Sequence, residues 1–277
     1  MGASVEAVLA DAADPWPVDA GAASCVVFSP PYTAGIDYDG APDADQMEWE
    51  AYEAMAVSVM KNARRALGIP GGRCWVNVVP TVPAAQHVNG GNGGHSGQTS
   101  AARVSLIDIW TRAGDRAGLS FRDLIAWATP GRAADCAWGS FQSPSAPNTR
   151  GEWEAILAFS HGDWARPTPD RWKGWKDGEG EWPRLCSNVW SIRPETDRTH
   201  PAPFPLELPM RCIRLSTWPD ERVLDPFVGA GTTMLAAQQL GRDCIGLDRS
   251  QQYVDMANER VAQLGLFGAT NVEVVAQ

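Results

Sequence analysis

The stretch Val223–Asp248, VLDPFVGAGTTMLAAQQLGRDCIGLD, decides the fold of this chain. An apolar run ends at Asp225, a turn with two glycines follows, and apolar residues then recur at helical spacing from Thr232. A second apolar run ends at Asp248. A strand, a turn, a helix and a strand in this order form the repeating unit of a parallel sheet that helices cover. The stretch therefore predicts an α/β fold.

The turn in this stretch also predicts a ligand. Gly229 and Gly231 allow the backbone to approach a bound molecule closely, and the carboxylate of Asp248 at the end of the next strand can accept hydrogen bonds from both hydroxyls of a ribose. The turn reads D-P-F-x-G-x-G-T-T and does not match the G-x-G-x-x-G pattern of dinucleotide-binding enzymes. A turn that only packs a helix on a sheet is the alternative. The order of turn, helix and acidic strand end favours a nucleoside site.

Strands and helices alternate through most of the chain, which predicts a mixed, mostly parallel sheet with helices on both faces. Two segments interrupt the alternation. The Gly-rich segment 88–103 is expected to be a mobile loop, and the segment 161–198 has no clear period and is rich in Trp, Pro and charge. The expected strands are 4–11, 24–29, 73–79, 122–129, 153–160, 222–226 and 243–248, and the expected helices are 43–67, 105–118, 205–217, 232–241 and 250–265.

The composition favours one large catalytic domain in the cytoplasm. The 277 residues are 44% hydrophobic, which is enough for a sizeable core. The net charge of −10 argues against a protein that coats nucleic acid, so any DNA must meet a local basic patch. The six cysteines lack C-x-x-C spacing and clustered His partners, so we expect reduced thiols and no metal site. With no basic-then-apolar leader and no apolar run of ~18 residues, we expect no membrane segment.

Four sequence blocks in a particular order carry a family resemblance. Ser29-Pro30-Pro31-Tyr32 directly follows the apolar run SCVVF, and residues 138–160, residues 200–216 and the stretch DPFVGAGTT come later. Together they resemble the amino-methylating DNA methyltransferases, which transfer a methyl group from S-adenosylmethionine to N4 of cytosine or N6 of adenine. Because the catalytic block precedes the cofactor block, the order is similar to that of the permuted β class. The resemblance implies a Rossmann-like methyltransferase fold with permuted motif order.

The resemblance implies a mechanism for the first block. An exocyclic amine is a poor nucleophile because its lone pair is delocalised into the ring, so acceptors for its N–H groups must favour a pyramidal nitrogen. In this interpretation the Ser29 hydroxyl and the Pro30 carbonyl accept those hydrogen bonds, Pro31 helps to hold the backbone, and the Tyr32 ring stacks on a base flipped out of the duplex. A strand followed by a Pro-Pro turn with a surface tyrosine is the alternative.

The first residue of the block bears on the target base. In the family, Ser at this position is associated mostly with N4-cytosine, and Asp or Asn mostly with N6-adenine. We therefore predict a site-specific DNA methyltransferase that acts on N4 of cytosine in double-stranded DNA. An N6-adenine methyltransferase and a catalytically silent subunit that binds cofactor or DNA are the alternatives. The predicted partners are duplex DNA and a cognate restriction endonuclease, and the predicted state is a monomer or a homodimer.

The resemblance also implies which residues bind S-adenosylmethionine. Asp11 ends a strand expected to neighbour the catalytic strand and would contact the adenine ring, or it would only cap its own loop. Thr232 at a helix N-terminus would bind the methionine carboxylate. His200 and Phe204 would line the pocket, or they would only close the fold. The full predicted set is Asp11, His200, Phe204, Asp225, Pro226, Phe227, Gly229, Gly231, Thr232, Thr233 and Asp248.

The segment 161–198 is the predicted DNA-contact insertion between a catalytic half, 1–160, and a cofactor-binding half, 199–277. It contains seven Lys or Arg, seven Asp or Glu, and five Trp. Cations interleaved with flat rings suit phosphate contact combined with stacking. A structural lobe pinned by Trp is the alternative. The predicted DNA-binding residues are Arg166, Arg171, Trp172, Lys173, Trp175 and Lys176.

Overall fold

A computed structural model of the chain describes residues 3–33, 47–68, 71–83, 102–129, 144, 151–177, 181–194 and 205–267. The strands are β1 (Val5–Leu9), β2 (Cys25–Phe28), β3 (Arg73–Val78), β4 (Thr81–Pro83), β5 (Arg103–Ser105), β6 (Ser120–Ala128), β7 (Trp153–Ser160), β8 (Val189–Ser191), β9 (Arg222–Asp225) and β10 (Asp243–Asp248). The helices are α1 (Trp49–Leu67), α2 (Leu106–Ala117), α3 (Trp182–Leu185), α4 (Glu207–Arg214), α5 (Thr232–Gln239) and α6 (Gln251–Phe267), and a 3₁₀ turn, η1, spans Asp170–Trp172.

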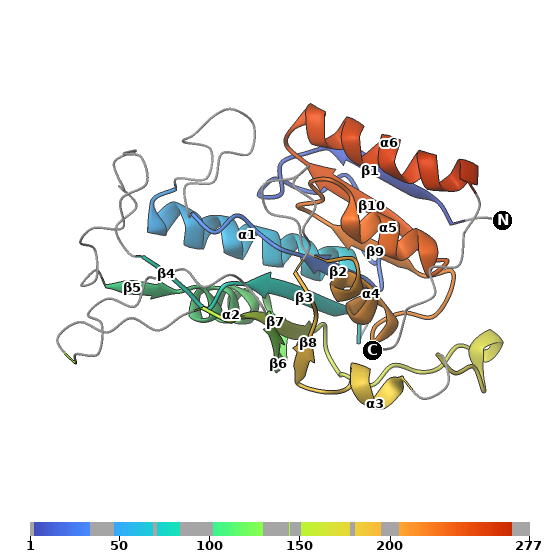
Figure 1. Cartoon of the computed structure of the whole chain (residues 1–277), viewed down its shortest axis with the longest axis horizontal. Coiled ribbons are helices and arrows are strands. Elements are labelled where there is room, and N and C mark those ends of the chain that lie inside the picture. Colours follow the sequence, from blue (N-terminus) through green and yellow to red (C-terminus); the bar gives the residue numbers. More distant parts are fainter. Residues whose placement is uncertain are drawn as a thin grey trace.

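One eight-stranded sheet runs through the molecule in the order β1-β10-β9-β2-β3-β7-β6-β8 (Figure 1). Only β7 is antiparallel to its neighbours, β3 and β6, and the other neighbouring pairs in this sheet are parallel. The predicted mixed, mostly parallel sheet is therefore confirmed. Strands from both halves of the chain share this sheet, because β9 and β10 lie between β1 and β2.

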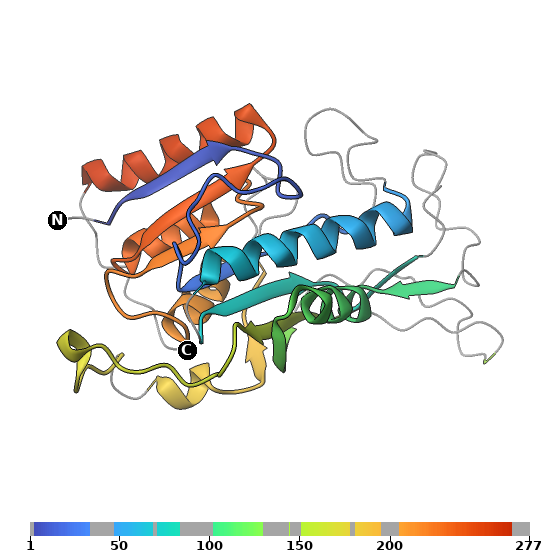
Figure 2. The same cartoon turned by 180° about the vertical axis from the view of Figure 1, so that it is seen from behind.

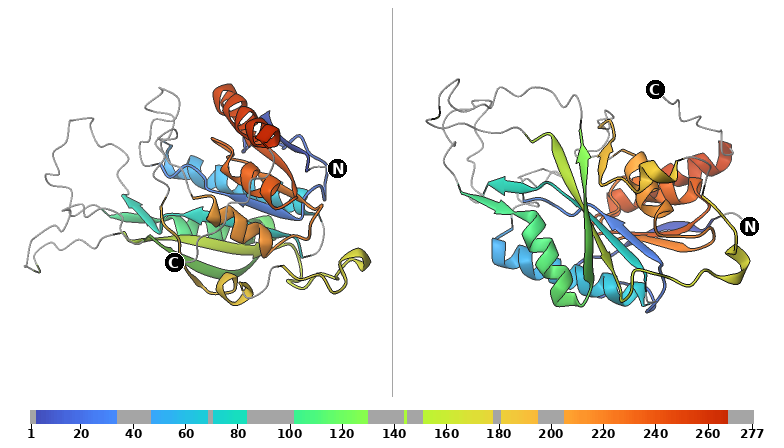
Figure 3. Two further views of the ribbon diagram at one scale, coloured as in Figure 1. Left: turned by 45° about the vertical axis from the view of Figure 1, so that its right-hand side comes forward. Right: turned by 90° about the horizontal axis from the view of Figure 1, so that it is seen from below.

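Helices cover both faces of the sheet, as the alternating sequence predicted. Figure 2 shows α1 and α2 across one face, and Figure 3 shows α4, α5 and α6 on the opposite side. Each layer has its own apolar cluster, one formed with α1 and α2 and the other with α4, α5 and α6. The whole of β2 is buried, which explains why its sequence, CVVF, is apolar at every position instead of alternating.

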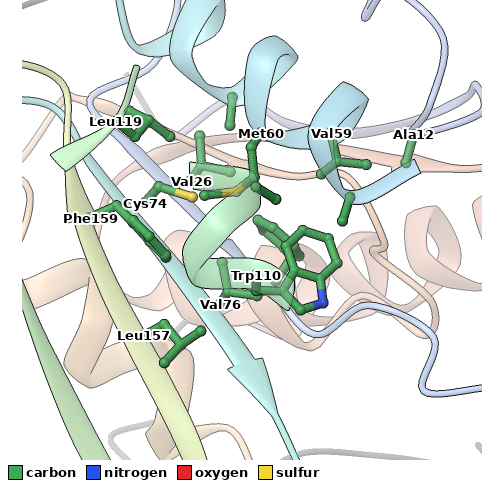
Figure 4. Packing of buried hydrophobic residues seen from close by; sticks show 14 of the residues in the cluster. Ala12, Val26, Val59, Met60, Cys74, Val76, Trp110, Leu119, Leu157 and Phe159 are labelled. Atoms are coloured by element: carbon green, nitrogen blue, oxygen red, sulfur yellow. The ribbon is translucent and has the colours of Figure 1, made fainter. Parts of the chain in front are cut away.

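The first cluster fixes the strands next to the catalytic block. Trp110 of α2 is fully buried and packs edge-on against Phe28 of β2, with ring centroids 5.4 Å apart. Figure 4 shows Trp110 beside Val76 of β3, with Phe159 of β7 close by. The helix approaches so closely that a Cβ on Gly114 would lie 2.5 Å from the Phe159 ring. This helix therefore packs directly on β7 and on β2, the strand that precedes the predicted catalytic residues.

The structure differs from the expected arrangement in two respects. The strand before Asp11 was expected beside the catalytic strand, and this is wrong, because β1 pairs with β10 at the edge of the sheet while β2 lies between β9 and β3. Four elements had no clear sequence signal because each is only three or four residues long. They are the antiparallel strands β4 and β5, the edge strand β8 and helix α3. Most of the Gly-rich segment 88–103 lies outside the described residues. None of the helices in the described part is long and apolar enough to cross a membrane.

Candidate active site

The carboxyl ends of the four parallel strands β1, β10, β9 and β2 lie along the same end of the sheet. We call this end the carboxyl edge, which is distinct from the edge strands β1 and β8. Ser29 directly follows β2, Asp225 ends β9, and Asp248 ends β10. Asp11 follows β1, whose Leu9 pairs with Asp248. The connection from β2 leads through α1 on one face, and the connection from β9 leads through α5 on the other face. Ligands of open α/β sheets bind where such connections diverge, so the predicted catalytic and cofactor blocks lie at the expected place.

The glycine turn is held to the end of β10. Asp248 accepts hydrogen bonds from the Gly229 N–H at 3.0 Å and from the Ser250 N–H at 2.9 Å, one on each carboxylate oxygen. Gly231 has a φ of 82°, and a Cβ there would lie 3.1 Å from Ala257 of α6. Glycine is therefore required at this position by its dihedral and by the close packing of the helix behind it.

The start of α5 suits an anion. No side chain caps the helix at Gly231, so its first N–H groups are free of a side-chain acceptor. Arg260 of α6 contacts the Thr232 hydroxyl at 3.3 Å, which adds positive charge to that of the helix dipole. The turn, the helix end and the Asp248 carboxylate together fit a molecule with a carboxylate and a ribose. These features of the chain fit S-adenosylmethionine.

The other predicted cofactor residues have different surroundings. The Phe227 ring packs on Phe28, with centroids 5.6 Å apart, and so joins the cofactor turn to the catalytic strand. Pro226 and Thr233 are buried, so they shape the turn from inside. The exposed Asp11 accepts a hydrogen bond from the Ala13 N–H at 2.8 Å and therefore caps its own loop, which leaves an adenine contact open. His200 and Phe204 lie outside the described residues.

Asp225 is a buried acid directly beneath this turn. It is 1% exposed and accepts a hydrogen bond from the Phe227 N–H at 2.9 Å. Burial raises the pKa of the Asp225 carboxyl to about 7, with a smaller upward contribution from the Asp248 charge. Burial therefore favours the neutral form of this carboxyl.

A hydrogen bond from helix α1 supports the backbone of the Ser-Pro-Pro-Tyr block. The Tyr52 hydroxyl of α1 donates a hydrogen bond to the Pro31 carbonyl at 2.8 Å and accepts one from the Trp110 indole at 3.1 Å. Thr33, the next residue after the block, has a φ of 55°, a conformation that non-glycine residues seldom adopt. This support keeps the turn after β2 in one conformation.

The side chains of the block form a polar cluster that the sequence did not reveal. The Ser29 hydroxyl lies 2.8 Å from the Tyr32 hydroxyl, which lies 3.2 Å from a carboxylate oxygen of Glu154 on β7. Asn77 of β3 donates to the same oxygen at 2.8 Å. The Tyr32 hydroxyl points inward, which the alternative of a surface tyrosine did not predict. Burial, with the negative charge of Glu154, raises the pKa of Tyr32 well above its ordinary value, so the phenol keeps its proton.

The predicted DNA-contact segment lies at the opposite edge of the sheet. Because β7 is antiparallel to β3, it delivers residue 161 next to the start of β3, where the His161 carbonyl accepts a hydrogen bond from the Gly71 N–H. Arg166 is buried there, pairs with Glu221 at 2.5 Å and donates to the Ser216 carbonyl. Figure 1 shows this yellow segment at the lower right, on the side of the chain's N-terminus.

The remaining predicted DNA-binding residues share this position. Trp172 packs edge-on against Trp175, whose ring faces Arg242 just before β10. Arg171, Lys173 and Lys176 are exposed. The structure therefore does not bring the six predicted DNA-binding residues to the catalytic block, and their contacts match the alternative of a structural lobe pinned by Trp.

Comparison with known proteins identifies the family. The family of N6 and N4 methylases, described as DNA methylase, matches residues 23–259. The chain belongs to this family, and S-adenosylmethionine is the family's methyl donor.

Among relatives, the chain is 28% identical to the Type II methyltransferase M.Cfr9I of Citrobacter freundii, over 87% of this chain and 82% of that protein. It is 32% identical to M.BglI of Bacillus subtilis over 55% of this chain, and that match spans 42% of the relative's length. The match to M1.MboII of Moraxella bovis spans 35% of that relative. M.BglI and M1.MboII are therefore much longer than the part that each shares with this chain.

Two solved structures share the fold. The putative DNA modification methylase TTHA0409 of Thermus thermophilus, in complex with S-adenosyl-L-methionine, has a TM-score of 0.70 at 25% identity over 94% of this chain and 93% of that one. The PvuII cytosine-N4-specific DNA methyltransferase has a TM-score of 0.68 at 20% identity over 98% and 89% of the two chains. The predicted Rossmann-like methyltransferase fold is thereby confirmed.

The buried acid gives a prediction on stability. Because the folded-state pKa of Asp225 lies above its ordinary value of 3.8, the folded protein holds a proton that the unfolded chain has lost. This contribution is complete below pH ~4 and disappears as the pH rises through about 7, and it is on the order of 4 kcal/mol. Asp225→Asn should remove it, so the difference in unfolding free energy between the variant and the wild type should change between pH 4 and 8.

Urea denaturation across this pH range measures the difference. Asp163→Asn, which removes an exposed carboxyl, serves as the matched control and should show no such dependence. Parallel pH curves for Asp225→Asn and the wild type would contradict the raised pKa.

Proposed function

We propose that this chain is a site-specific DNA methyltransferase that transfers a methyl group from S-adenosylmethionine to N4 of cytosine in double-stranded DNA. The observation that carries the proposal is the meeting of two blocks from distant parts of the sequence. Ser29 follows β2 and the DPFVGAGTT turn follows β9, and these strands are paired neighbours. A methyl donor on the turn and an amine at Ser29 would then lie side by side.

The proposed cofactor residues each contribute a defined contact. Asp248 would accept hydrogen bonds from the ribose hydroxyls, and the free N–H groups at the start of α5 would bind the methionine carboxylate. Phe227 would line the pocket on the side of the catalytic strand. Bound S-adenosylmethionine supplies an electrophilic methyl group on a positively charged sulfur.

The catalytic block would prepare the amine. The Ser29 hydroxyl and the Pro30 carbonyl accept hydrogen bonds from the two N–H groups, which favours a pyramidal nitrogen whose lone pair points at the methyl group. Much of the rate then comes from holding the two reacting atoms in line. The target base reaches this position only when it is flipped out of the duplex. The choice of cytosine follows from Ser29 at the first position of the block.

The DNA would contact the carboxyl edge. Arg193 follows β8, which runs parallel to β6 and therefore ends at this edge, and its side chain is exposed. Arg103 begins β5, which pairs with β4 beyond the carboxyl end of β3. Exposed guanidinium groups suit phosphate contacts. We propose these two residues as DNA contacts in place of the cations of the segment 161–177.

Expression in a host that lacks DNA methylation, followed by modification-sensitive sequencing, tests the function directly. The expected result is N4-methylcytosine at one short recognition sequence. N6-methyladenine would overturn the choice of base but keep the reaction, and unmodified DNA from cells that contain the folded protein would overturn the methyltransferase proposal.

The cofactor site gives a second test. Asp248→Ala should weaken S-adenosylmethionine binding about 10-fold to 100-fold, or about 1 to 3 kcal/mol, because ribose hydrogen bonds are lost. Isothermal titration calorimetry measures this, with Asp255→Ala on the exposed face of α6 as the control. Equal affinities for Asp248→Ala and the control would place the cofactor elsewhere.

The proposed DNA-binding surface gives a third test. The double variant Arg103→Ala and Arg193→Ala should weaken DNA binding and reduce the slope of log affinity against log salt by about 2, since one counterion is released for each phosphate contact. The triple variant Arg171→Ala, Lys173→Ala and Lys176→Ala removes more charge from the opposite edge and should leave the slope unchanged. A reduced slope in the triple variant, with an unchanged slope in the double variant, would indicate that the DNA contacts the segment 161–177.

A further inference from the structure

A row of polar side chains crosses three neighbouring strands next to the catalytic block. Ser29 follows β2, Asn77 lies on β3, and Glu154 lies on β7, on the sheet face that α4 covers. Asn77 is 3% exposed and Glu154 is 6% exposed. Their buried neighbours along the strands, Val76 and Val78 on β3 and Ala155 on β7, are apolar. Buried carboxylates are costly unless they are hydrogen-bonded, and the acceptors already assigned to the amine do not include Glu154.

Glu154 belongs to a continuous chain of hydrogen bonds. Its carboxylate accepts from Asn77 Nδ2 at 2.8 Å and from the Tyr32 hydroxyl at 3.2 Å. The Tyr32 oxygen lies 2.8 Å from Ser29 Oγ, and Asn77 Nδ2 lies 3.1 Å from the same phenol oxygen. Ser29, where the amine would bind, is thereby connected to a buried carboxylate through a single phenol.

The carboxylate determines the direction of this chain. An ionised carboxylate can only accept hydrogen bonds, and a charged acceptor at 3.2 Å is stronger than the neutral Asn77 carbonyl at 3.3 Å from the same phenol oxygen, so the Tyr32 O–H donates to Glu154. The phenol oxygen then accepts the Ser29 O–H, and both lone pairs of Ser29 Oγ remain for a donor from outside. In the reverse direction Ser29 Oγ would accept from Tyr32, so only one lone pair would remain, and its own O–H would point to the Asn77 carbonyl or into the site.

We propose that Glu154 is a positioning residue that makes Ser29 an acceptor for the target amine and takes up the proton that the methylated amine releases. This rests on the methyl transfer proposed above and applies to an amine of either base. As the N–C bond forms and the C–S bond breaks, the electron pair of the broken bond stays on sulfur and the nitrogen becomes positive. The nitrogen proton passes to Ser29 Oγ, the Ser29 proton to Tyr32, and the Tyr32 proton to Glu154, which becomes a neutral acid until it loses the proton to water.

The test is single-turnover transfer of labelled methyl groups to DNA by Glu154→Gln. The amide keeps the size and an acceptor oxygen, so S-adenosylmethionine and DNA affinities should stay within about twofold, while the transfer rate falls about 100-fold, as for loss of a general base. The fall should be confined to the transfer step, which a general loss of structure would not produce. Glu152→Gln, an exposed carboxylate two residues earlier, is the matched control and should keep the wild-type rate.

Each outcome separates this inference from the proposed function. A wild-type transfer rate in Glu154→Gln would overturn the role of Glu154, whereas a wild-type protein that transfers no methyl to DNA would overturn the proposed function instead. If Glu154→Gln fails to fold, Tyr32→Phe breaks the same chain and keeps the ring. Its transfer rate should then fall while its S-adenosylmethionine and DNA affinities stay within about twofold, and a wild-type rate in Tyr32→Phe would also overturn the inference.

Discussion

The pairing of β2 with β9 is the constraint on which the rest of the site depends. Cys25 pairs with Val223 and Val26 with Leu224, so two segments from opposite ends of the chain run parallel at the centre of the sheet. Their carboxyl ends carry the catalytic block and the cofactor turn. The Phe28 and Phe227 rings pack together just beyond the pairing. A shift of either strand would separate these blocks, and burial holds both strands in place, since all of β2 and the three residues of β9 after Arg222 are buried.

The two ends of the strands differ in the contacts that cover them. At the edge opposite the site, Arg166 pairs with Glu221 and reaches Ser24, which ties the segment after β7 to the starts of β2 and β9. Arg73 donates to the Trp164 carbonyl and lies over its ring. These contacts are local anchors for a long irregular segment. They leave the carboxyl edge as the side where strand ends, a helix N-terminus and the polar chain of Glu154 converge.

Polar groups inside the sheet link stability to function. Asn77 and Glu154 occupy strand positions where an apolar residue would pack without a desolvation cost. Each is kept by hydrogen bonds to the other and to Tyr32. The position of the cluster beside Ser29 is the one that the proposed role of Glu154 requires. Asp225 shows the same pattern under the cofactor turn.

The sequence by itself determined the α/β class and located the glycine turn, the acidic strand end and the Ser-Pro-Pro-Tyr block that we propose as catalytic, because each of these is a short-range pattern. Tertiary structure decided the features that depend on pairing between distant strands. The place of β1 beside β10 depends on which strands fill the centre of the sheet. The position of the segment 161–177 depends on the direction of β7, because an antiparallel strand brings the chain to the side of the sheet opposite the carboxyl edge. Asn77 and Glu154 were visible only as single polar residues in apolar runs, and register alone placed them beside Tyr32.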